Sequence, residues 1–152
     1  MRDLTAEEHE VIERRRAGLD LFLQERMPVL AEFAEALQLS DPAQITEDPD
    51  ACLPSVSAFI RDRTIEDDDQ NWILTRVGYL VGDVLVQRLG GAWFLNDVPD
   101  TRYFARYVVG RFSRAPRATV EPFEVAIALL SMPLGRDLVE LVAEVEREAR
   151  GE

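Results

Sequence analysis

The chain has 152 residues, 47% of them hydrophobic, which is enough for one domain with a sizeable buried core. Its formal net charge is -12, and all 17 of its basic residues are arginine. We expect a chain this acidic to repel nucleic acid and anionic membranes over most of its surface. Charged residues make up 30% of the composition, near the ordinary globular value, which excludes wholesale disorder.

Two residue types are too scarce to build several kinds of site. Cys52 is the single cysteine and His9 the single histidine, so an internal disulfide and a zinc site of the usual ligands are excluded. The first residues are charged, unlike a signal peptide, and no apolar run approaches the ~20 residues of a membrane span. We therefore expect a cytoplasmic protein without membrane association.

Apolar residues at helical spacing predict that the chain begins with a helix. Thr5 and Glu8 form a capping-box pattern that starts this helix, and it should run to about residue 26. Pro28 is expected to break or kink the helix, because proline lacks a backbone donor and clashes with the preceding turn. A second helical stretch is predicted over residues 30–37.

The next stretch is the loosest part of the sequence. Residues 40–54 hold three prolines among acidic and serine residues, which indicates a surface loop with a turn of helix in it. A short helix is expected over residues 54–62. Residues 1–63 would then form the helical N-terminal part of a single domain that spans residues 1–152.

Near the centre of the chain the spacing of apolar residues changes from the helical period to the alternation of strands. Residues 64–89 carry a wide apolar face at helical spacing and are followed by two glycines, which predicts a central helix with a glycine cap. The pattern then alternates as in strands over residues 92–96 and 102–109, with a turn-rich hairpin loop between them. Residues 118–120 are a candidate third strand.

Helices are expected to close the chain, over residues 122–131 and from about residue 137 onward. Residues 64–152 would form a helix–hairpin–helix core. The predicted fold class is α+β and dominated by helix. It comprises several N-terminal helices, a central helix, a small antiparallel sheet and C-terminal helices.

Charge is distributed unevenly along the chain. The net charge is -11 over residues 1–71, -1 over 72–101 and -5 over 121–152, whereas residues 102–120 contain five arginines and no acid. Aromatic residues alternate with these arginines. Three interpretations remain open: ion pairs with acidic helices of the same chain, contact with a protein partner, and contact with nucleic acid, which the overall acidity disfavours. The five are Arg102, Arg106, Arg111, Arg114 and Arg117.

No catalytic constellation is recognisable. His9 lies in a charged helix, and nothing in the sequence places a nucleophile beside it. The acidic run at residues 66–69 would point in several directions on a helix, which favours helix-start electrostatics over a metal site. Glycine-rich nucleotide loops and metalloprotease motifs are absent from the sequence. We therefore expect no metal and no cofactor, and we favour a protein that is not an enzyme.

Asp83 is unusual because it interrupts an apolar stripe. A buried carboxylate requires a partner, and Arg76, Arg88 or an arginine from the strands is a candidate. A structural ion pair and a functional polar site both remain open. Gly78 and Gly82 lie one turn apart on the same helix, where they would allow close approach of another backbone.

The sequence of residues 78–93 is similar to a pattern found in other proteins. These residues read Gly-Tyr-Leu-Val-Gly-Asp-Val-Leu and then, after five residues, Gly-Ala-Trp. This segment resembles a family of small uncharacterised bacterial domains, in which such a helix runs into Gly-Gly-x-Trp, a hairpin and a helix opened by proline, as at Pro122 here. The spacing departs slightly, because Gly78 directly precedes Tyr79. The resemblance implies a bacterial α+β domain without assigned chemistry and, by analogy, an immunity or accessory factor.

The leading hypothesis is a non-enzymatic, acidic bacterial protein that binds another protein. It would use either its acidic N-terminal helices against a basic partner or its arginine-rich segment against an acidic one. The alternative is an enzyme or small-ligand binder with a pocket between the central helix and the sheet. The sequence leaves the oligomeric state open. The candidate binding residues are Tyr79, Asp83, Trp93, Arg102, Tyr103 and Arg106.

Overall fold

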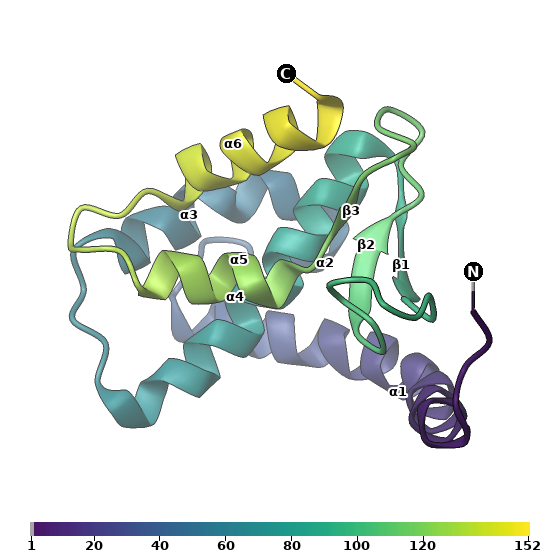
Figure 1. Cartoon of the computed structure of the whole chain (residues 1–152). Coiled ribbons are helices and arrows are strands. Elements are labelled where there is room, and N and C mark those ends of the chain that lie inside the picture. Colours follow the sequence, from purple (N-terminus) through teal and green to yellow (C-terminus); the bar gives the residue numbers. More distant parts are fainter. Residues whose placement is uncertain (1) are drawn as a thin grey trace.

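The computed structural model describes residues 2–152, which form helices packed around a central helix and a small sheet beside them (Figure 1). The sheet lies at one end of the helices, and α4 runs through the middle of the fold. This arrangement confirms the predicted α+β class with helix dominating. In chain order the elements are α1 (Ala6–Ala36), α2 (Gln44–Glu47), α3 (Pro49–Arg61), α4 (Asp67–Leu89), β1 (Ala92–Leu95), β2 (Tyr107–Gly110), β3 (Thr119–Val120), α5 (Pro122–Leu130) and α6 (Leu138–Arg150).

Helix α1 begins where the capping box predicts. The Thr5 hydroxyl accepts a hydrogen bond from the Glu8 backbone at 3.1 Å, and the Glu8 carboxylate accepts one from the Thr5 backbone at 2.9 Å. Of the two outcomes expected at Pro28, a break or a kink, the break is wrong, because α1 continues as one helix to Ala36. Its last turns bury apolar side chains such as Phe33 in the core, and this burial offsets the ~3 kcal/mol that an interior proline costs.

Helix α3 begins earlier in the chain than predicted. The expected surface loop over residues 40–54 is wrong in its second half, since α3 starts at Pro49 and continues through Pro54. Tertiary contacts hold its first turn, because the Asp50 carboxylate pairs with Arg88 of α4 at 2.7 Å. Such a partner, 38 positions away, leaves no local signal in the sequence.

Helix α4 is the central helix that its wide apolar face predicts. Most of its second half is buried, and it packs against α1, α3, α5 and both longer strands. It ends at Gly90, whose φ of 70° is the left-handed conformation expected of a glycine cap. Within residues 2–152, no helix has the combination of length and apolar character that a membrane crossing requires.

The sheet is antiparallel in the order β1-β2-β3, and the predicted third strand is present. The second predicted strand is wrong over residues 102–106, because the ladder begins only at Tyr107, opposite Leu95. Beyond that pair, Ala105 adopts a φ of 64° and its backbone donates to the Asn96 carbonyl at 2.8 Å. This left-handed residue turns the chain out of the ladder, so residues before it form a connection.

The two glycines of α4 are approached by aromatic rings and not by a backbone, which corrects the prediction. A β-carbon on Gly82 would collide with the Trp93 indole, and one on Gly78 would collide with the Phe123 ring. Glycine at these positions therefore lets β1 and α5 lie closely against the central helix.

We predict that Gly82→Ala lowers the free energy of unfolding by about 2–3 kcal/mol, because the added methyl overpacks the core against a rigid indole. Urea unfolding followed by tryptophan fluorescence measures the effect. Asn71→Ala, at an exposed position of the same helix, is the control and should change stability by about 0.5 kcal/mol or less. Equal stabilities for the two variants would contradict the assigned position of Trp93.

Candidate functional site

Asp83 lies in the core, 9% exposed, and its Oδ1 atom accepts two hydrogen bonds. One comes from the Trp93 indole nitrogen at 2.9 Å, and the other comes from the Arg26 guanidinium, which also forms an ion pair with it. These partners belong to β1 and α1, so the single carboxylate joins three elements. Burial raises the pKa of Asp83, whereas the Trp93 and Arg26 hydrogen bonds oppose that rise.

The partner of Asp83 is not one that the sequence proposed from the same helix. Arg76 stacks over the Trp72 ring, 4.3 Å from its centroid, and Arg88 pairs with Asp50 and with Glu146. Arg26 was missed because it lies 57 positions away in α1. Its place one turn after a half-buried aromatic, Phe22, is the only local sign that it faces inward.

Five aromatic rings form a cluster that includes Trp93, the hydrogen-bond partner of Asp83. Phe22 of α1 contacts four of the others, with ring centroids 5.3 Å from Tyr79, 5.3 Å from Trp93, 4.5 Å from Tyr107 and 6.2 Å from Phe123. The rings fill the space between α1, α4, α5 and the sheet. The structure thus brings the predicted residues Tyr79, Asp83 and Trp93 together, and it places them in a packed core.

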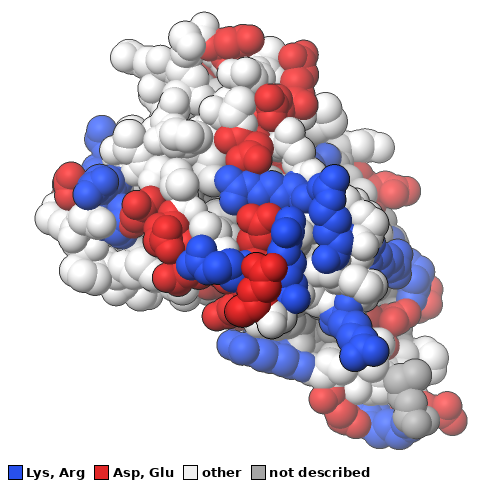
Figure 2. All heavy atoms as spheres, turned by 90° about the horizontal axis from the view of Figure 1, so that it is seen from above, with Lys and Arg blue, Asp and Glu red and all other residues white. Residues whose placement is uncertain are grey.

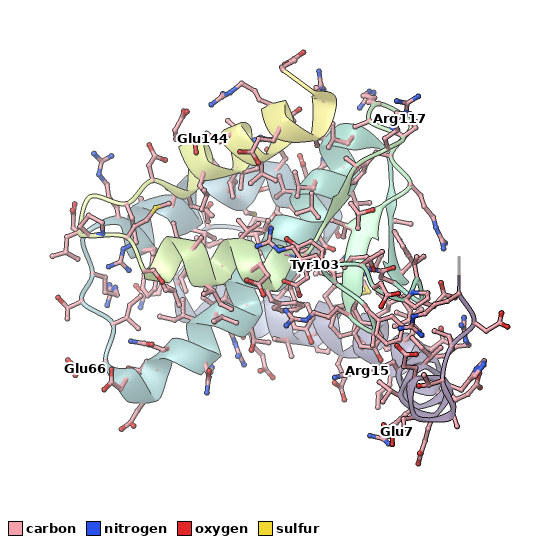
Figure 3. All side chains as sticks on the ribbon, in the orientation of Figure 1. Glu7, Arg15, Glu66, Tyr103, Arg117 and Glu144 are labelled. Carbon is pink, nitrogen blue, oxygen red and sulfur yellow. The ribbon has the colours of Figure 1, made fainter. Side chains whose placement is uncertain are left out.

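The other three predicted site residues lie elsewhere. Arg102 and Tyr103 border a surface groove of about 570 Å³ between β3, α5 and α6. Arg106 pairs with Glu124 of α5 at 2.8 Å, and it lines a different cavity. In Figure 3 Tyr103 lies beside the start of α5, whereas Arg117 lies near the C-terminal end of α6. The six candidates therefore belong to two separate places in the fold.

The groove combines an aliphatic floor with a border of mixed charge, since Arg102 and Arg117 line it together with Glu121, Glu124 and Glu148. The floor comes from α5 and α6, and Arg102 and Arg117 border it on the side of the sheet. A second hollow, of about 510 Å³, shares Arg117 with the groove and adds Arg114 and Arg150. The sequence analysis did not predict this floor, because its residues come from two helices that approach each other only in the tertiary structure. The floor residues are Val125, Ala128, Leu141, Val145 and Ala149.

Four of the five arginines of residues 102–120 form no ion pair with a carboxylate of the described chain; Arg106 is the exception. Arg102 lies over the Tyr103 ring at 5.1 Å, and Arg111 lies over the Phe94 ring at 4.1 Å. Arg114 donates to the Arg88 backbone carbonyl. Internal pairing with acidic helices thus explains one arginine of the segment.

Three acidic side chains also line the groove: Glu121, Glu124 and Glu148. Figure 2 views the molecule from above Figure 1 and shows several arginines side by side with acidic residues between them. Glu121, 4% exposed, contributes to the groove and caps α5 by accepting from the Glu124 backbone. Burial raises the pKa of Glu121 above its ordinary value. Among residues 2–152, no three acidic, cysteine or histidine side chains gather closely enough to hold a metal ion.

Comparisons of the chain with protein-family models, with curated proteins and with solved structures gave no match. The function of the groove is therefore inferred from its geometry and its charge.

We predict that Asp83→Asn lowers the free energy of unfolding by about 2–3 kcal/mol, because it leaves the Arg26 guanidinium without a counter-charge. The cost stays below the roughly 3–5 kcal/mol of a fully buried pair, since the Arg26 side chain is 20% exposed. Adding Arg26→Met to Asp83→Asn should recover most of the loss in a double-mutant cycle measured by urea unfolding. Arg76→Met, which removes an arginine without an ion pair, is the control and should cost about 1 kcal/mol or less. If the costs of Arg26→Met and Asp83→Asn simply add in the double variant, the predicted coupling between these two side chains is refuted.

We predict that Glu121→Gln flattens the decline of stability with rising pH. The raised pKa means that the folded chain still holds a proton where the unfolded chain has released it. The stabilisation that Glu121 contributes is therefore fully present below the ordinary glutamate pKa of about 4.3, and it is lost as the pH rises through the folded value. Thermal unfolding at a series of pH values measures the slope. Glu144→Gln, on the exposed face of α6, should keep the wild-type slope.

Proposed function

We propose that this protein is a non-enzymatic binding module that holds a short acidic segment of another protein in the groove between β3, α5 and α6. One observation carries the proposal: Arg102 and Arg117 border a groove with an aliphatic floor, and neither has a carboxylate partner in the described chain although glutamates also line the groove. Groove floors of this kind bind apolar side chains, and the border selects for charge.

The two arginines supply specificity for carboxylates. A guanidinium presents a planar fork of donors that matches a carboxylate with two parallel hydrogen bonds. Arg102 and Arg117 are exposed, so their gain on binding is modest for each pair, about 0.2–1 kcal/mol while the pairs remain in water. Closure of the groove by the partner would strengthen these pairs, because desolvated charges interact more strongly.

The remaining charge of the molecule limits the size of the acidic partner segment. With a net charge of -12, the chain repels a uniformly acidic protein at long range. A short acidic segment that also carries aliphatic side chains meets the arginines locally and buries its apolar part against α5 and α6. Repulsion from the rest of the surface then disfavours other orientations.

The resemblance of residues 78–93 to small bacterial domains supports an accessory or immunity-like role of this kind in the bacterial cytoplasm. Such a role needs neither a cofactor nor nucleic acid.

A random peptide display library tests the proposal with the wild type and two charge-reversed variants. We expect the wild type to enrich peptides in which Asp or Glu adjoins aliphatic residues. Arg102→Glu with Arg117→Glu should weaken binding of an enriched peptide at least about tenfold, which corresponds to about 1.4 kcal/mol. Raised salt should weaken wild-type binding as well.

Arg14→Glu with Arg61→Glu is the matched control, because both side chains are exposed and lie outside the groove. This variant carries the same net charge as the groove variant and should retain the peptide. Enrichment of peptides without acidic residues would overturn the proposal. Equal losses for the two variants would also overturn it, since they would trace the effect to net charge alone.

A further inference from the structure

A cavity of about 290 Å³, distinct from the groove and from the hollow beside it, lies between α1, the connection before β2 and α5. It shares only Glu121 with the groove. Its volume is near the lower end of the range found for ligand pockets, which suits a compound of one or two rings. The residues that argue for a ligand are Arg15, Phe22, Arg106, Tyr107 and Phe123.

Three aromatic side chains form the walls of this cavity. The Phe22 and Tyr107 ring centroids are 4.5 Å apart at an interplanar angle of 41°, and Phe123 lies 6.2 Å from Phe22. All three rings are half-buried, so each offers part of its surface to the cavity. Aromatic rings pack against one another in tilted or offset arrangements, which favours a planar aromatic guest.

Two arginines add positive charge to the cavity. Arg15 is exposed and forms no ion pair with a carboxylate of the described chain, and its guanidinium lies 6.0 Å from the Tyr107 ring centroid. Arg106 uses one terminal nitrogen for Glu124, so its other terminal nitrogen remains available as a donor. Guanidinium groups beside an aromatic wall favour an anion, and they match a carboxylate best with two parallel hydrogen bonds.

The cavity is preorganised by contacts of its own residues. The Tyr107 hydroxyl donates to the Arg15 backbone carbonyl at 2.6 Å. This hydrogen bond fixes the Tyr107 ring, which is one wall of the cavity, against the α1 backbone at Arg15. The Glu121 carboxylate also lines the cavity, and it accepts a hydrogen bond from the Glu124 backbone, which fixes its position at the start of α5. A site that is ordered before binding loses less entropy when its ligand enters.

We infer that this cavity binds a small planar aromatic carboxylate. Its ring lies among Phe22, Tyr107 and Phe123, and its carboxylate meets Arg15 and the free edge of Arg106. This inference is independent of the proposed peptide groove, because the two sites use different arginines.

Ligand-observed and ¹H–¹⁵N NMR titrations test the inference with indole-3-carboxylate and its neutral counterpart, indole-3-carboxamide. We expect the carboxylate to bind the wild type and to shift backbone resonances of Phe22, Tyr107 and Phe123. The carboxamide should bind at least about tenfold more weakly, since it lacks the charge that the arginines recognise. Indole phosphate analogues that bind more tightly than the carboxylate would overturn the assigned ligand class.

Arg15→Glu should weaken carboxylate binding at least about tenfold and leave the fold intact, because the contact with Tyr107 uses the backbone of residue 15. Arg14→Glu is the matched control, adjacent in α1 but outside the cavity, and it should bind as the wild type does. The groove variant Arg102→Glu with Arg117→Glu should also retain the carboxylate. No shifts at millimolar ligand, or equal losses for Arg14→Glu and Arg15→Glu, would overturn the inference.

Discussion

One buried carboxylate oxygen joins three elements of the fold. Oδ1 of Asp83 accepts from the Trp93 indole and from the Arg26 guanidinium, so that α4, β1 and α1 meet at a buried carboxylate. Removing its partners would leave a charge in the core at a cost of several kcal/mol, which makes the arrangement of the three elements specific. The absence of a side chain at Gly82 completes this arrangement, because the indole reaches Asp83 only by lying against that backbone.

Aromatic rings connect this central polar contact with a small cavity at the surface. Phe22 extends the core from the Asp83 pair to Tyr107 and Phe123, and the outer parts of these rings become the walls of a small cavity. On the far side of Glu121, β3 and the two C-terminal helices leave an aliphatic groove. Arginines without carboxylate partners border both places, beside glutamates that also line them, so this acidic protein presents unpaired guanidinium groups at defined positions.

Local patterns were sufficient where a residue's role depends on its near neighbours. The Thr5 capping box, the glycine after α4 and the proline at the start of α5 each act within one turn, and each lies where predicted. Predictions failed where a distant contact outweighed a local preference. Pro28 did not end α1, because the turns after it are buried, and α3 began early because Asp50 has a partner in α4. The six candidate residues were divided between core and surface for the same reason.

By itself, the sequence determined the fold class, the central helix, the need for a partner at Asp83 and the concentration of arginine over residues 102–120. These properties follow from composition and from the periods of the helix and the strand, which are local. The tertiary structure decided that Arg26 is that partner, that Trp93 and Phe123 fill the space at the two glycines, and that unpaired arginines border a groove and a cavity. Those outcomes depend on which distant surfaces meet, and the free energy of packing, summed over the whole chain, selects among them.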